Sequence, residues 1–278
     1  MTASALPTPA AHTSSEVLQR ARSDPAYAAF LLLRIGFTVL PIVFGLDKFT
    51  NVFTNWEGYL APWIVDMSPI GAHQVMLVVG VIEIVAGLAV AIKPRYAAYI
   101  VAAWLAGIII NLLSYPGFYD IALRDFGLLL AALTLGRLAF VYDPAYAAFL
   151  VLRIGFTVLP IVFGLDKFTN VLTKWEVYLA PWIVDMSPIS AHQVMLVVGV
   201  IEIAAGVAVA IKPRYAAYIV AAWLAGIIFN LLSYPGFYDV ALRDVGLLLA
   251  ALTLGGLASV YDPAWHRRTT SGTDSPVA

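Results

Sequence analysis

Ionisable residues stand inside stretches of sequence that are otherwise apolar, at two positions separated by 119 residues. Glu83 lies within AHQVMLVVGVIEIVAGLAVAI, and Glu202 takes the same place in a second copy of that stretch. A carboxylate inside a membrane-spanning segment is costly, which makes it a candidate for function. Arg34 and Arg153 lie in the preceding apolar stretches, and we expect each to reach the glutamate of its own copy. Such a pair could accept a proton or anchor a ligand, or it could only fix the register of two helices.

A second group of polar residues gathers where the apolar stretches begin or end on one side of the membrane. Histidine, asparagine and tyrosine donors beside an apolar slot would suit the carbonyl of a quinone or a similar lipid-soluble molecule. The structural alternatives are a histidine that caps a helix and an aspartate that favours a helix N-terminus. The candidate binding residues are Asp47, Lys48, His73, Asn111, Tyr115, Arg124 and Asp125, with Asp166, Lys167, His192, Asn230, Tyr234, Arg243 and Asp244 in the second copy. No metal-ligand set is visible among them.

These residues require helices to position them, and each copy supplies four apolar stretches of about 20 residues, the length that spans a bilayer. In the first copy they are 27–46, 73–92, 96–114 and 122–142. At the helical period, each stretch has one seam of small and polar residues, which indicates a bundle with a polar interior and a lipid-facing exterior. The seams are Arg34, Thr38, Pro41, Gly45 and Lys48; His73, Met76, Gly80, Glu83 and Gly87; Ala103, Gly107, Asn111 and Ser114; Arg124, Gly127, Ala131 and Thr134.

Composition places the chain in the membrane. Of its 278 residues 62% are hydrophobic and 12% charged, whereas a soluble domain has about 25% charged residues. The chain has no cysteine, so disulfides, thiolate metal sites and paired-cysteine redox chemistry are excluded. A net charge of −1 gives no basic footprint, so we expect no nucleic-acid partner.

The chain contains a tandem duplication of one unit. Residues 24–142 align with 143–261 over 119 positions, of which 12 differ and 107 are identical. Because four spans is an even number, both copies insert with the same orientation. We therefore expect an all-α integral membrane fold of two four-helix bundles, eight spans in all, related by a pseudo-two-fold axis along the membrane normal. No difference removes an ionisable residue from a seam, which predicts two equivalent sites. Residues 1–23 should be a disordered tail, and 262–278 a second tail.

The remaining segments predict the topology. Within the polar loop near 47–72, the stretch WEGYLAPWIVDMSP (56–69) is too polar and proline-rich to span, which favours a lid or a re-entrant segment. Trp56, Trp63, Trp175 and Trp182 suit an interfacial belt. Lysine and arginine favour cytoplasmic N- and C-termini by nine to five, and we expect a bacterial inner membrane. The inner residues are Arg20, Arg22, Lys93, Arg95, Arg137, Lys212, Arg214, Arg267 and Arg268; the outer ones are Lys48, Arg124, Lys167, Lys174 and Arg243.

Three segments, LLRIGFTVLPIVFGLDKF, GVIEIVAGLAVAIKPR and ALRDFGLLLAALTL, together resemble the DoxX/DoxX-like family of small four-span membrane proteins over 28–142 and 147–261. The resemblance implies a membrane partner or quinone-side subunit of a redox system, because the family includes the small membrane subunit of a thiosulfate:quinone oxidoreductase. By position it carries over Arg34, Lys48, Glu83, Arg124 and Asp125, with Arg153, Lys167, Glu202, Arg243 and Asp244. The departure is the duplication, since the family is typically a single unit, and it suggests an internal pseudo-dimer.

Three functions follow as hypotheses. The first is a subunit that binds a quinone or a similar lipid-soluble molecule and serves a redox complex, with no metal or flavin of its own. The second is a proton-coupled small-solute transporter in which Glu83 and Glu202 are the coupling carboxylates. The third is a non-catalytic scaffold that assembles partner subunits on its two faces.

Overall fold

The computed structural model describes residues 14–140 and 145–262, and every element within these ranges is a helix. The first half contains α1 (Ser14–Ser23), α2 (Pro25–Asp47), η1 (Trp56–Tyr59), α3 (Pro62–Met67), α4 (Ala72–Ile92), α5 (Pro94–Leu113) and α6 (Tyr119–Leu138). The second half repeats this order with α7 (Ala145–Thr169), η2 (Trp175–Tyr178), α8 (Pro181–Met186), α9 (Ala191–Ile211), α10 (Pro213–Leu232) and α11 (Tyr238–Tyr261).

Seven of these helices are long and apolar enough to cross a membrane, namely α2, α4, α5, α7, α9, α10 and α11. The chain is therefore an integral membrane helical protein. The helix α6 has a comparable length, but Asp120, Arg124, Asp125 and Arg137 make it more charged. The first three of these side chains are buried inside the protein, so their charge does not face lipid.

Local sequence sets the helix ends close to where the apolar stretches predict them. Asp24 begins α2 as its N-cap, because its Oδ1 accepts from the backbone N–H groups of Ala26 at 2.9 Å and Tyr27 at 3.2 Å. The helix α4 ends at Ile92 because Pro94 disfavours a helical conformation at the preceding residue, Lys93.

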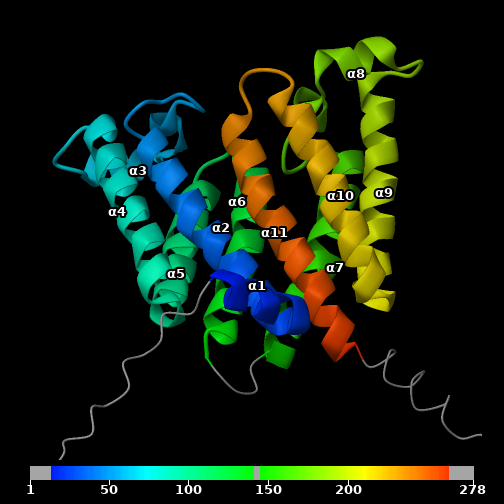
Figure 1. Ribbon diagram of the computed structural model, residues 1–278. Helices are drawn as coiled ribbons and strands as arrows, with labels where there is room; N and C mark the ends of the chain where they lie inside the picture. The colour runs from blue at the N-terminus through cyan, green and yellow to red at the C-terminus, as the bar shows by residue number, and fades with distance from the viewer. Residues whose placement is uncertain (1–13, 141–144, 263–278) are drawn as a thin grey trace, which may run out of the picture.

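The two halves pack through their central helices. Within the first half α4 packs on α2 and α5 packs on α6, and α9, α7, α10 and α11 repeat these pairs. The helix α11 also packs against α2, and α6 against α7, so each half contacts the other along two long helices. Figure 1 shows α6 and α11 in the middle, with α4 and α5 at one edge and α9 and α10 at the other.

The predicted seam is confirmed on α6, confirmed on α4 except for the exposed His73, and wrong on α5. The buried face of α4 contains Met76, Gly80, Glu83 and Gly87, and that of α6 contains its whole predicted seam. On α5, however, Ala103, Gly107 and Ser114 are exposed. Its buried face consists of Ala97, Ala98, Val101, Ala102 and Leu112. These alanines let α5 approach α6 closely, as small residues do in membranes.

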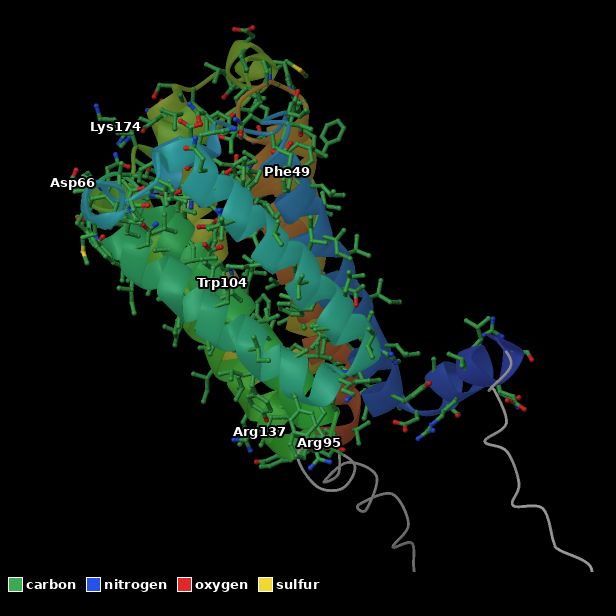
Figure 2. All side chains as sticks on the ribbon, turned by 90° about the vertical axis from the view of Figure 1, so that its left-hand side faces the viewer. Phe49, Asp66, Arg95, Trp104, Arg137 and Lys174 are labelled. Carbon is green, nitrogen blue, oxygen red and sulfur yellow. The ribbon has the colours of Figure 1, made fainter. Side chains whose placement is uncertain are left out.

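The prediction of a disordered tail over residues 1–23 is wrong for its second part. Residues 14–23 form the helix α1, which Figure 2 shows projecting from the bundle beside the first turn of α2. The guanidinium of Arg20 stacks over the ring of Tyr27, at 4.4 Å from the ring centre, and ties α1 to α2. Residues 1–13 and 263–278 lie outside the described residues, as does the junction 141–144.

Candidate functional site

The site begins with a close crossing of α2 and α4. A Cβ added at Gly45 would lie 2.5 Å from the carbonyl oxygen of Gly80, and one added at Gly80 would lie 2.7 Å from that of Gly45. Only glycine permits this approach, and Gly164 and Gly199 repeat it in the second half. The crossing brings the C-terminal end of α2 against the middle of α4.

A buried ion pair spans this crossing. Lys48 Nζ donates to Glu83 Oε2 at 2.6 Å, and Lys167 Nζ donates to Glu202 Oε2 at 2.6 Å. The Lys48 ammonium also lies 3.9 Å from the centre of the Trp56 ring. A charge removed from water needs both a counter-ion and further favourable contacts, and Lys48 has both.

The prediction that Arg34 pairs with Glu83 is wrong. Arg34 instead donates to the carbonyl oxygen of Ala91, and Arg153 donates to that of Ala210 at 2.6 Å. These carbonyls belong to the last turns of α4 and α9, which lack helical partners, so both arginines serve as C-terminal caps. Arg34 and Arg153 therefore lie at the opposite end of the bundle from Lys48 and Lys167, which are the partners of the glutamates.

The non-spanning segment between α2 and α4 covers the ion pair, as predicted for a lid. We call residues 51–71 the first lid and 170–190 the second lid. Asp47, which is 4% exposed, organises the start of the first lid by accepting from the backbone N–H of Val52 at 2.9 Å and from Trp56 Nε1 at 2.8 Å. Asp166 makes the same bonds to Val171 and Trp175. The two aspartates thus position the lids and are not free to bind a ligand.

The rest of the first lid is held by residues at and just after the C-terminal end of α5. Asn111 Oδ1 accepts from the backbone N–H of Ala61 at 2.9 Å, and its Nδ2 donates to the carbonyl oxygen of Tyr59 at 2.7 Å. The hydroxyl of Tyr115 donates to Gly58 O at 3.1 Å. Asn230 and Tyr234 hold the second lid through the equivalent backbone groups. Burial raises the pKa values of Tyr115 and Tyr234 to about 12.

The two histidines of the predicted mouth lie at its exposed rim. His73 Nδ1 is 2.9 Å from Glu57 Oε1, and His192 Nδ1 is 2.7 Å from Glu176 Oε1. The hydrogen bond from His192 lowers the pKa of Glu176 below its usual value. Each histidine thus joins its lid to the first turn of α4 or α9. Because each is about half exposed, it does not face the buried ion pair.

The charged residues of α6 and α11 meet at the centre of the protein. We call Asp120, Arg124, Asp125, Asp239, Arg243 and Asp244 the central cluster. Arg124 Nε donates to Asp244 Oδ1 at 3.3 Å, and Arg243 Nε donates to Asp125 Oδ1 at 3.0 Å, so each bond joins the two halves. Arg124 and Arg243 also bind Asp120 at 2.7 Å and Asp239 at 2.9 Å within their own helices.

Each lid reaches this cluster in the opposite half. The hydroxyl of Tyr59 donates to Asp239 Oδ2 at 2.6 Å, and that of Tyr178 donates to Asp120 Oδ2 at 2.6 Å. Burial raises the pKa values of both tyrosines far above their usual value, and a nearby arginine opposes this shift. The phenols therefore stay protonated and act as hydrogen-bond donors.

A cavity lies under each lid. The first cavity, of about 320 Å³, is lined by α2, the first lid, α4, α5 and α6, and Arg243 of the opposite half contributes to its wall. Lys48, Glu83, Asn111 and Asp125 are polar residues in an otherwise mostly apolar lining. The second cavity, between the corresponding helices, has about 80 Å³ and does not extend to the counterparts of Tyr59 and Asn111. The predicted equivalence of the two sites therefore holds for the ion pair and the cluster but not for the volume of the cavities.

Each cavity has a tryptophan with an unused donor in its wall. Trp104 lines the first cavity and Trp223 the second, and the buried Nε1 atoms of both have no hydrogen-bond partner among the described residues. A buried donor without a partner costs about 1–3 kcal/mol. A ligand oxygen within reach would remove that cost. Figure 2 places Trp104 midway along α5, on the side that faces α4.

The structure thus divides the predicted site residues into two sets. Lys48, Glu83, Arg124, Asp125 and their repeats come together around the cavities, whereas the others position lids or cap helices. Sequence reasoning missed several residues that matter: Trp56, Tyr59, Trp104, Asp120, and the repeats Trp175, Tyr178, Trp223 and Asp239. Of these, Asp120 had a usable signal, because it stands four residues before Arg124 on one helix face. Trp56 and Trp175 were predicted in an interfacial belt, which is wrong because they are 2% and 3% exposed and bind Asp47 and Asp166.

No protein-family model, curated protein or solved structure matches this chain. Within residues 14–140 and 145–262, no group of three or more histidine, aspartate or glutamate side chains could hold a metal ion.

Proposed function

We propose that this protein binds a lipid-soluble molecule with a carbonyl group, of the quinone class, in the first cavity. The observation that carries the proposal is the combination of an apolar cavity of about 320 Å³ with a buried indole N–H that has no partner. That volume lies near the lower end of ligand pockets, about 300–1,000 Å³. It suits a single ring system and leaves a long apolar tail outside.

A route for the tail supports the proposal. The helices α4 and α5 both line the first cavity but pack mainly on α2 and α6, and they contact each other sparingly. Figure 2 shows them diverging from a common lower end. Gly107 lines the cavity and is exposed, and a Cβ added there would meet no atom within 4 Å. A tail would leave between α4 and α5 into the lipid.

The polar end of the cavity supports a carbonyl ligand over a plain hydrocarbon. The Lys48–Glu83 pair and Asp125 with Arg243 all lie in the wall. Pairs of opposite charge in a water-poor site stabilise a partial charge that develops on a bound oxygen. We propose Glu83 and Lys48 as the residues next to the ligand's head, with Glu202 and Lys167 as their counterparts in the smaller cavity.

The membrane arrangement belongs to the same proposal. We propose eight spans, with α6 as the eighth, and a pseudo-two-fold axis along the membrane normal between α6 and α11. Four of the five cations predicted on the outer side, Lys48, Arg124, Lys167 and Arg243, are buried, so only Lys174 remains on that side. Figure 2 places Arg95 and Arg137 at the opposite end from Asp66 and Lys174. The positive-inside rule then favours cytoplasmic termini.

The resemblance to DoxX-like proteins adds the redox context. We propose that the bound molecule exchanges with a membrane redox system in a bacterial inner membrane. The apolar helices indicate that a lipid bilayer surrounds the protein. No observation favours the third hypothesis, a scaffold for partner subunits. Proton-coupled transport is the second candidate, because Glu83 is a buried carboxylate in the wall of a cavity.

The test is binding of a labelled short-chain benzoquinone to the purified protein in nanodiscs, together with identification of small molecules retained after mild detergent extraction. We expect saturable binding of about one molecule per chain. Trp104→Phe should weaken it about fivefold, the loss of one hydrogen bond of about 1 kcal/mol. Trp223→Phe should change it less, because the second cavity is smaller.

Trp63→Phe is the matched control, because its indole N–H already donates to Ser114 Oγ at 2.8 Å outside the cavity. Binding no greater than that of empty nanodiscs would overturn the proposal. So would equal binding by the Trp104→Phe variant and the wild-type protein. If no quinone binds, and protons cross the membrane of proteoliposomes only when Glu83 and Glu202 are both present, proton-coupled transport becomes the better-supported function.

A further inference from the structure

The central cluster contains more acidic than basic side chains. It holds four aspartates and two arginines, Asp120, Asp125, Asp239, Asp244, Arg124 and Arg243, which amounts to a formal charge of −2 if every group is ionised. All six side chains are at most 8% exposed. The Lys48–Glu83 and Lys167–Glu202 pairs beside it are each neutral and do not compensate the excess.

An uncompensated buried charge is costly enough that the group takes up a proton instead. The effective penalty for burying one ion is several kcal/mol, and a carboxyl group in such a place neutralises by shifting its protonation. Neutrality of the cluster requires two protons. Because each half contributes the same three residues to the cluster, two aspartates and one arginine, we expect one proton in each half.

The hydrogen bonds indicate which carboxyl groups carry them. Asp120 Oδ2 accepts from both Arg124 Nη1 and Tyr178, and Asp239 Oδ2 accepts from both Arg243 Nη1 and Tyr59. Two donors to one oxygen favour the ionised form. Asp120 and Asp239 are therefore the carboxylates that balance the arginines.

Asp125 and Asp244 differ from this pair. Each accepts one bond, at Oδ1, from an arginine of the opposite half, and among the described residues no donor binds the Oδ2 of either. Asp125 is 3% exposed and lies in the wall of the first cavity, and Asp244 is 2% exposed and lies in that of the second. A carboxyl oxygen without a donor, on a residue that lines a cavity, is a position where a proton can be held and exchanged.

We propose that Asp125 and Asp244 form an intramembrane proton-binding site, with one proton on the Oδ2 atom of each carboxyl group facing its cavity. When a proton leaves Asp125 for an acceptor in the cavity, the carboxylate that remains is held by Arg243, and the cluster carries one negative charge until it is refilled. The charged groups around Asp125 are Lys48 at the end of α2, Glu83 on α4, Arg124 on α6, and Asp239 and Arg243 on α11. Tyr59 of η1 lines the same cavity and binds Asp239, and Asp244 on α11 binds Arg124.

This site goes beyond the binding of a quinone and does not depend on it. A bound quinone that takes up electrons elsewhere in its cycle would need a proton source in the cavity wall. A transporter would need a carboxyl group that alternates between two protonation states. The proton site is common to both, and it can be measured on the protein without any ligand.

The experiment is infrared spectroscopy of the purified protein at neutral pH, which detects the carbonyl band of protonated carboxylic acids. We expect this band in the wild-type protein, with a shift in heavy water. Asp125→Asn and Asp244→Asn should each remove about half of it, and the double variant should remove it all. Asp66→Asn is the control, because Asp66 is exposed on α3 and should contribute nothing.

A second measurement protects the test against misfolding. Asparagine resembles a protonated aspartic acid, so Asp125→Asn should keep the thermal stability of the wild-type protein, whereas Asp120→Asn should lose stability because Arg124 and Tyr178 lose an ionised partner. Absence of the band from the wild-type protein, or a band that persists in the double variant, would overturn the proposal. Retention of the band in a protein that binds no quinone would reject the quinone proposal alone.

Discussion

Lys48 and Glu83 meet because of the direction in which helical side chains lean. In a helix each side chain tilts toward the N-terminus. The helices α2 and α4 run antiparallel, so Lys48 leans from the C-terminal end of α2 into the bundle while Glu83 leans toward the N-terminal end of α4. Arg34 leans away from Glu83. It is level with Ala91, eight residues further along α4, which at about 1.5 Å per residue is about 12 Å from the level of Glu83.

At this scale we predict the response to breaking the ion pair. Glu83→Gln or Lys48→Met alone should destabilise the protein by about 3–5 kcal/mol, because each leaves a buried charge without its partner or a buried donor or acceptor unsatisfied. The double variant Lys48→Met/Glu83→Gln should lose less than the sum of the two single variants. Thermal unfolding in one fixed detergent measures this.

Arg34→Met provides the comparison for the single variants. It removes a bond to a helix C-terminus but no charge partner, so it should cost less than either of them. Strict additivity of Lys48→Met and Glu83→Gln would contradict the pairing.

The sequence predicts the ionisable positions better than it predicts their partners. Glu83, Lys48, Arg124 and Asp125 stand out by charge alone in apolar surroundings. The pairing of Lys48 with Glu83 depends on how far α2 slides along α4, and the position of Gly45 against Gly80 decides that. Nothing in one helix specifies the register of its neighbour, so a partner chosen by reach alone can be wrong.

At the scale of elements, glycine at the crossing of α2 and α4 controls the site. We predict that Gly80→Ala will destabilise the protein by about 1–3 kcal/mol through overpacking, because its Cβ would lie 2.7 Å from the carbonyl oxygen of Gly45, a backbone atom that cannot turn aside. The helices must separate, which should lengthen the contact between Lys48 and Glu83 and weaken ligand binding as well. Thermal unfolding and the quinone-binding assay measure the two effects.

Gly107→Ala is the matched control for Gly80→Ala. It lies in a helix of the same half, and a Cβ there meets no atom within 4 Å. Alanine also favours a helix over glycine by about 1 kcal/mol, so this variant should be as stable as the wild-type protein or more so. Equal loss of stability in both variants would show that close packing at Gly80 is not the cause.

The helices themselves were predictable because a bilayer fixes their length and proline fixes several of their ends. It was harder to predict which face of each helix is exposed. The seam of Ala103, Gly107 and Ser114 on α5 has the composition of a buried face, yet it is exposed. Alanine is abundant on both sides of this helix, so small residues alone do not distinguish the side that packs on α6.

At the scale of the whole molecule, the duplication predicted two similar bundles but not their exchange of residues. Each cavity is completed by an arginine of the other half, and each lid binds an aspartate of the other half. Nearly identical copies give no sequence signal for contacts between copies, because a contact within one copy and a contact across to the other involve the same residue types. From the sequence alone, Arg124 could have been paired with an aspartate of its own half, and Asp244 with the arginine of its own half.

The last prediction tests whether α6 crosses the membrane. The chain has no cysteine, so single cysteines can be labelled without background. With eight spans, Met67→Cys and Met186→Cys in the two lids should react with an impermeant thiol reagent from the same side, and Lys93→Cys and Lys212→Cys from the opposite side. With seven spans, the second half would be inverted, and the two lids would react from opposite sides.

The labelling works on both lids because Met67 and Met186 are 79% and 78% exposed. Arg137→Cys completes the test, because Arg137 is exposed at the end of α6 that lies beside Arg95 in Figure 2. It should react from the same side as Lys93→Cys. Reaction from the lid side instead would mean that α6 does not span.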